Sequence, residues 1–182
     1  AAGYEVTDIR DLVQADTGRV MREFLDKVAG GGADTDAFVY FSGYGAQVDS
    51  ENYLIPVDAT IRGEADIANE AFRLNDFLNE LAQAQAKTKI VVVDASRDHN
   101  IPNVVKGLAI TEVPAGMLVG FAAAPATASI EGQGPYSLYA AALVSQMRDP
   151  SLEIADVFKT ARANISKATN AAQIPWSASA LS

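Results

Sequence analysis

Apolar residues gather into short runs that are separated by polar turns. Three runs are rich in β-branched and aromatic side chains, which is typical of buried strands: residues 37–41, 89–93 and 117–122. The run at 89–93 is the strongest, because its β-branched residues suit a parallel strand that is covered on both faces. Residues 4–12 are predicted to form a further strand.

Four segments carry apolar residues at the spacing of an amphipathic helix. They are residues 20–28 behind Asp16 or Thr17 as N-cap, the segment from Asn75 onwards, residues 136–147 and residues 152–169. Strands that alternate with helices predict an α/β fold with a mostly parallel central sheet and helices on both faces. No linker-like or repetitive segment divides the chain, so residues 1–182 are predicted to form one domain.

Two polar loops follow directly after predicted strands, at the place where α/β sheets commonly bind ligands. The first is Ser42-Gly43-Tyr44-Gly45, and the second begins with Asp94-Ala95-Ser96-Arg97. Between them, residues 47–54 are predicted to form a hairpin that turns at residues 49–52, and a polar loop follows to about Arg73. Glycines at positions 43 and 45 are expected to allow a tight turn or a positive φ.

The composition excludes several classes of protein. Of the 182 residues, 49% are hydrophobic and 20% are charged, as in ordinary globular domains. The chain has 23 acidic residues and 14 Lys and Arg, and this net charge of −9 disfavours binding to nucleic acid or to an anionic membrane. No apolar run approaches the ~18 residues that a membrane-spanning helix needs. Cysteine is absent, which excludes a cysteine nucleophile in this chain.

Both loops resemble segments of caspase-like peptidases, in particular those of bacterial metacaspase relatives. In that family the first loop reads Ser-Gly-His-Gly and the second reads Asp-Ala-Cys-Arg. Positions 44 and 96 are 52 residues apart, close to the family's separation of about 50 between histidine and cysteine. Further similar segments are residues 51–59, 121–125, 128–129, 134–137 and 173–176. The resemblance spans nearly the whole chain and implies the caspase-hemoglobinase three-layer sandwich.

The resemblance places Tyr44 and Ser96 at the two catalytic positions, and neither is the family's own residue. A cysteine works because its pKa of about 8.5 leaves some thiolate at neutral pH, where a histidine exchanges protons readily. A serine hydroxyl needs a base during attack, whereas a tyrosine, with an ordinary pKa of about 10, accepts a proton poorly at pH 7. The pair is therefore expected to be inactive, in a pseudopeptidase that binds peptides or proteins or regulates an active homologue.

Two other functions stay open. In the first, Ser96 is the nucleophile of a weak serine hydrolase, and His99, the only histidine, is its base three residues downstream. Against this, His99 is expected to point away from the site as the chain leaves the sheet. In the second, the chain is an inactivated form of a cysteine endopeptidase that prefers Arg or Lys before the cleaved bond.

The remaining pocket residues follow from the resemblance alone. They are Gly43, Gly45, Asp94, Arg97 and Ser129. The backbone N–H groups around Gly45 and Ser96 correspond to oxyanion donors, and Asp94 corresponds to the acid that accepts a basic side chain. The other interpretation of Asp94 is a loop acid that binds nearby backbone groups.

No metal or other cofactor is predicted. Some relatives bind calcium, and Asp49, Glu51 and Asp58 are acidic, but their spacing does not fit an EF-hand loop. A solvated acidic hairpin is expected instead.

Caspase-like domains begin with an apolar strand and a helix that precede the strand expected here at residues 4–12, and this sequence contains neither. It is therefore interpreted as one domain without that first strand and helix, taken from a longer protein. The alternative is a domain whose open sheet edge pairs with another molecule. The Ala-rich, acidic composition suggests a bacterial protein, either cytoplasmic or periplasmic.

Overall fold

A four-stranded sheet forms the centre of the computed structural model, which describes residues 3–130, 132 and 134–181. Its strands, in spatial order, are β1 (Asp36–Ser42), β5 (Thr88–Asp94), β6 (Met117–Phe121) and β7 (Trp176–Ser179). The first three run parallel, and β7 is antiparallel to β6. The predicted mostly parallel α/β sheet is confirmed.

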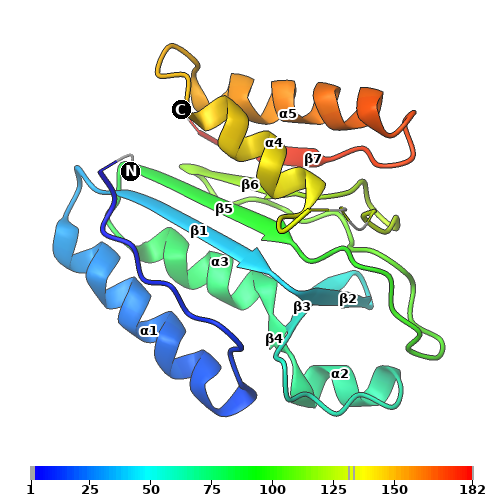
Figure 1. Cartoon of the computed structure of the whole chain (residues 1–182). Helices are drawn as coiled ribbons and strands as arrows, with labels where there is room; N and C mark the ends of the chain where they lie inside the picture. Colours follow the sequence, from blue (N-terminus) through cyan, green and yellow to red (C-terminus); the bar gives the residue numbers. More distant parts are fainter. Residues whose placement is uncertain (1–2, 131, 133, 182) are drawn as a thin grey trace.

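Helices cover both faces of this sheet (Figure 1). On one face lie α1 (Gln14–Gly31) and α3 (Leu74–Gln83), and on the other lie α4 (Leu138–Met147) and α5 (Ile154–Ala168). Side chains of β5 alternate between the two cores, because successive residues of a strand point to opposite faces. Val91 and Val93 join the core under α1 and α3, while Ile90 and Val92 join the core under α4 and α5.

The apolar stripe of α3 shows why this segment forms a helix. Its residues at helical spacing are all buried against the sheet: Leu74, Phe77, Leu78 and Leu81. Burial of one whole face stabilises the helix far more than propensity does. The helix predicted from about Asn75 is confirmed, and it begins one residue earlier.

A small antiparallel sheet extends from the end of β1. It consists of β2 (Tyr44–Val48), β3 (Glu51–Ile55) and β4 (Phe72–Arg73). The hairpin turns at Asp49 and Ser50, which both have positive φ, as a two-residue turn of the type I′ class requires. The prediction of a longer turn through Asn52 is wrong, because Asn52 lies inside β3 and is buried.

The predicted strand at residues 4–12 is wrong. This segment forms no regular element, and no backbone hydrogen bonds between described residues join it to β1. Side chains hold it instead: the Tyr4 ring contacts Phe38, and Glu5 forms an exposed ion pair with Lys27 of α1. Its alternating apolar residues suggested a strand. A strand, however, needs a neighbouring strand that forms hydrogen bonds with its backbone N–H and C=O groups.

Other boundaries also differ from the sequence prediction. The first helix begins at Gln14. Thr17, an expected N-cap, lies inside this helix, and its hydroxyl donates a hydrogen bond to the carbonyl of Val13. The Gln14 N–H donates to the Asp58 carboxylate at 2.8 Å, so the cap comes from a distant segment. Helix α2 (Glu64–Glu70) forms within the predicted polar loop, where only Ile67 supplies a buried side chain. No helix in the described part of the chain is both long and apolar enough to span a membrane.

Candidate active site

The two predicted loops meet at one edge of the sheet. β1 and β5 are adjacent and parallel, with Ser42 beside Asp94 in the register, so both strands end at the same level. The Gly43 N–H donates to the Asp94 carbonyl at 3.2 Å, which ties the start of one loop to the end of the neighbouring strand. Parallel pairing therefore brings residues 42–45 and 94–98 together, although about 50 residues separate them in the chain.

Ser96 lies under the surface and its hydroxyl has no partner. Its side chain follows β5 directly, and the residue is 1% exposed. The Ser96 Oγ makes no hydrogen bond with any described residue. Tyr44, at the first position of β2, is 49% exposed, and the Arg97 guanidinium lies 6.0 Å from the centre of its ring. The structure thus shows no hydrogen bond between the two residues expected at the catalytic positions.

His99 does not serve Ser96 in this structure. Its Nδ1 accepts a long hydrogen bond from the Ile101 N–H, at 3.4 Å, and its buried Nε2 has no partner among the described residues. Burial lowers the pKa of the imidazole; Asp98 opposes this effect and Lys106 adds to it. Burial thus favours the neutral form of the imidazole, and neither of its nitrogens bonds the serine hydroxyl.

The other expected pocket residues lie around these two loops. Position 45 has no room for a side chain. A Cβ there would lie 3.0 Å from Leu108 and 3.1 Å from the Ala95 carbonyl oxygen. Neither Gly43 nor Gly45 has a positive φ, so close packing, and not turn geometry, explains the glycine at position 45. The Ser129 N–H donates to the Ser96 carbonyl at 2.6 Å, which brings this distant serine to the site.

Asp94 is the centre of a buried polar cluster. It is 2% exposed, and its Oδ2 accepts hydrogen bonds from the hydroxyls of Tyr40, at 2.6 Å, and Ser137. Burial and the bond to Asp94 raise the pKa of Tyr40 far above its ordinary value, so this hydroxyl stays a donor. Both hydroxyls donate to the same oxygen, and no described residue bonds Oδ1 of this carboxylate.

The comparison with known protein families covers the full chain. The family model of the peptidase C14 caspase domain matches residues 1–182. The chain belongs to the caspase-domain family. No curated protein matches it at a significant level.

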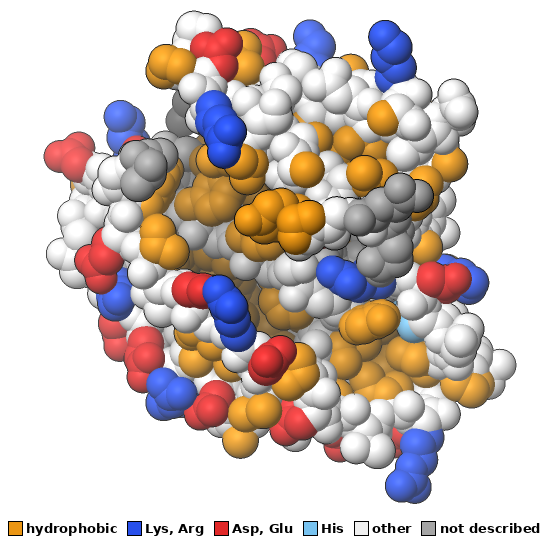
Figure 2. Space-filling view, in the orientation of Figure 1, with side chains coloured by type: hydrophobic (Ala, Val, Ile, Leu, Met, Phe, Trp, Pro, Cys, Tyr) orange, Lys and Arg blue, Asp and Glu red, His pale blue; other side chains and the backbone are white. Residues whose placement is uncertain are grey.

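An apolar groove leads away from the Asp94 cluster of this caspase domain. It has a volume of about 560 Å³ and lies between β1 and α4, with Tyr40, Ser137 and Arg97 at its polar end. Phe38, Leu143 and other apolar side chains line the remainder. Figure 2 shows hydrophobic side chains gathered in this hollow. A groove of this kind, with few polar groups at one end, is typical of ligand sites.

Tyr40 and Ser137 are site residues that sequence reasoning missed. Tyr40 was hidden inside an apolar strand, where an aromatic residue reads as core. Ser137 is the N-cap of α4, with its Oγ accepting from the Ala140 N–H at 2.9 Å. The pattern of a serine before an apolar helix could have identified the cap, but only the fold brings that serine to Asp94.

The acidic residues considered for calcium are engaged separately. Glu51 accepts a hydrogen bond from the Asn75 side chain, and Asp58 caps α1, while Asp49 lies in the β2–β3 turn. Among the described residues, no group of three His, Asp or Glu side chains is placed to hold a metal ion. Glu51 and Asp58 therefore each have a hydrogen-bond partner, and Asp49 occupies a turn position.

Proposed function

We propose that this caspase domain binds a peptide or protein segment without cleaving it. The buried Ser96 hydroxyl carries the proposal, since it contacts no base and a serine needs one to attack a peptide bond. Tyr44 replaces the family's histidine and its ring lies next to Arg97, not on the serine. Bound partners would be substrates that are held but not processed, or an active homologue that this domain regulates.

The groove supports the binding part of this proposal. It is lined by Tyr40 and Ser137, the two donors on Asp94, and the Asp94 oxygen that no described residue bonds suits the guanidinium or ammonium group of an Arg or Lys side chain. The apolar walls suit the residues that flank it in an extended peptide. The ligand class is therefore a peptide that combines one basic residue with apolar neighbours.

Turnover measurements test the inactive part. We expect the purified chain to release no fluorophore from Arg- or Lys-amide peptides beyond the level of a Ser96→Ala variant. A fluorophosphonate probe should likewise leave Ser96 unlabelled. Labelling that disappears in both Ser96→Ala and His99→Ala would instead identify a serine hydrolase and would refute the proposal. Cleavage by the double variant Tyr44→His/Ser96→Cys would support it, because only the catalytic pair would then be missing.

Binding measurements test the other part. The fluorescence anisotropy of a labelled, Arg-containing apolar peptide should rise when the peptide is titrated with the chain. Asp94→Asn should weaken this binding about tenfold, as expected for loss of a charge-assisted hydrogen bond. Asp36→Asn, at the opposite end of β1, is the matched control and should bind as the parent does. Equal binding by all three proteins, or none by the parent, would contradict the peptide assignment.

A further inference from the structure

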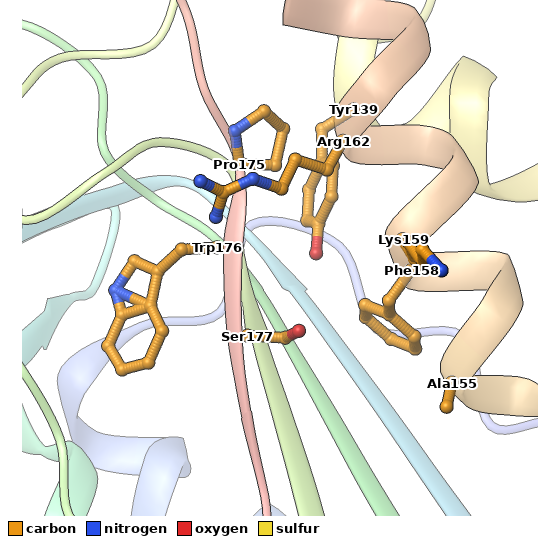
Figure 3. Close-up of a pocket in the computed structure, with 8 residues that line it drawn as sticks. All are labelled: Tyr139, Ala155, Phe158, Lys159, Arg162, Pro175, Trp176 and Ser177. Carbon is orange, nitrogen blue, oxygen red and sulfur yellow. The ribbon is translucent and has the colours of Figure 1, made fainter.

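A second cavity lies between α5 and β7, and it shares no lining residue with the groove beside Asp94. Its volume is about 160 Å³. It lies among residues of α5, the start of β7, Pro175 just before that strand and one residue of α4, as Figure 3 shows. Nothing in the proposed peptide site uses these residues, so the cavity requires an explanation of its own.

Tyr139 supplies an unsatisfied hydroxyl to this cavity. The residue comes from α4 and is 1% exposed, and its Oη makes no hydrogen bond with any described residue. In Figure 3 the hydroxyl points between Phe158 of α5 and the β7 residues Trp176 and Ser177. A buried hydroxyl without a partner is costly, and a ligand that accepts its hydrogen bond would remove that cost. Burial, with a smaller contribution from Asp94, raises the pKa of Tyr139, so the group remains a donor.

The charged residues of the cavity are all basic. Lys159 and Arg162 lie one turn apart on α5 and line it, and neither forms an ion pair with a described residue. In Figure 3, Arg162 reaches from the helix to β7 beside Pro175 and Trp176. No acidic side chain is among the described residues that line the cavity, in a chain with 23 acidic residues. Hydroxyl, guanidinium and ammonium groups together favour an oxyanion.

The walls and the size define the remainder of the ligand. Phe158 and Pro175 provide apolar surface next to the donors, whereas the Trp176 ring points to the other face of the sheet and stacks on Phe121. A cavity of about 150 Å³ holds a molecule such as benzene, so this one accommodates a six-carbon body. We propose that the cavity between α5 and β7 binds a small free carboxylic acid, with its apolar body against Phe158 and Pro175 and its carboxylate on Tyr139 and Arg162.

The heat of binding reports occupancy of the cavity. The full chain is titrated with cyclohexanecarboxylate by isothermal titration calorimetry. We expect a saturable change in the heat of each addition. The neutral isostere cyclohexanecarboxamide should give a dissociation constant at least tenfold higher, because it lacks the charge that Arg162 binds.

Three variants assign the contacts. Arg162→Met keeps an apolar stem and should weaken acid binding about tenfold, and Tyr139→Phe should weaken it several-fold. Tyr139→Phe removes only an unpartnered hydroxyl, so the fold is expected to tolerate it. Arg22→Met, on α1 across the sheet, removes a charge of the same kind and should bind as the parent does.

Several outcomes would overturn the proposal. These are an absence of any saturable change up to about 10 mM acid, equal affinity for acid and amide, or unchanged binding by Arg162→Met and Tyr139→Phe. A short N-acetylated peptide with a free C-terminal carboxylate is titrated in parallel. If this peptide bound and the free acid did not, the site would belong to a protein terminus, and the assignment to a small molecule would be wrong.

Discussion

Ser96 and His99 each bury a polar atom that has no hydrogen-bond partner among the described residues. Such atoms cost about 1–3 kcal/mol each when they are fully desolvated, and they concentrate at functional sites. In this caspase domain the two atoms lie three residues apart and do not bond each other. At the scale of single residues, neither buried atom therefore has the partner that proton transfer between these two side chains would need.

The imidazole of His99 gives a prediction at the residue scale. Burial lowers its pKa in the folded chain, whereas the unfolded chain binds a proton near the ordinary value of about 6.5. Its contribution to stability is therefore complete above pH 6.5 and decreases as the pH falls from there through the folded pKa. The free energy of unfolding is measured with urea at pH 7.5 and at pH 5.5. Its decrease between these two pH values should be larger for the parent than for His99→Gln.

The same residue allows a direct check, since a single histidine gives one imidazole signal in an NMR titration. A measured pKa at or above the ordinary value, or equal losses of stability in both proteins, would show that burial does not control this histidine.

At the scale of elements, one glycine determines how closely α4 and α5 approach the sheet. A Cβ on Gly120 of β6 would lie 2.6 Å from the Tyr139 hydroxyl oxygen and would also overlap the Phe158 ring. The side-chain-free position thus lets α4 and α5 pack directly on the strand.

Replacement of this glycine gives a prediction at the element scale. Gly120→Ala should lower the free energy of unfolding by about 1–3 kcal/mol, because it overpacks a rigid core. Gly30→Ala, in the last turn of α1 with no atom near the added methyl group, is the matched control. It should be neutral or stabilising by about 0.4–1 kcal/mol. Urea titration followed by circular dichroism compares them, and equal stability of both variants would contradict this packing argument.

At the scale of the whole molecule, electrostatic self-repulsion outweighs ion pairing. The net charge is −9, and each ion pair between described residues has both side chains at least 45% exposed. Exposed pairs of this kind stabilise by about 0–1 kcal/mol each. Salt therefore screens more repulsion than attraction.

The whole-molecule prediction is that salt stabilises the chain. Raising NaCl from 20 to 200 mM should increase stability on the order of 1 kcal/mol, which corresponds to roughly 2–4 °C in Tm for a chain of this size. Choline chloride at equal ionic strength is the control and should act alike, since screening does not depend on the cation. A Tm that falls with salt would show that attractive pairs dominate instead.

The sequence by itself determined the strands and helices whose periodicity reflects burial. β5 and α3 were predictable because one apolar pattern in each allows only one buried arrangement. The two loops that carry Tyr44 and Ser96 were also readable directly from the sequence, since both follow predicted strands, and the family match covers them. Such patterns do not show which residues from distant parts of the sequence meet in the fold.

Only the tertiary structure decided which residues complete the sites. Tyr40 and Ser137 meet on Asp94 because parallel pairing and the start of α4 bring three separate segments together. The unsatisfied Tyr139 hydroxyl becomes meaningful only where α5 and β7 enclose it. Residues 4–12 failed as a strand for the same physical reason, since pairing depends on a neighbour's backbone and local alternation does not reveal whether that neighbour is there.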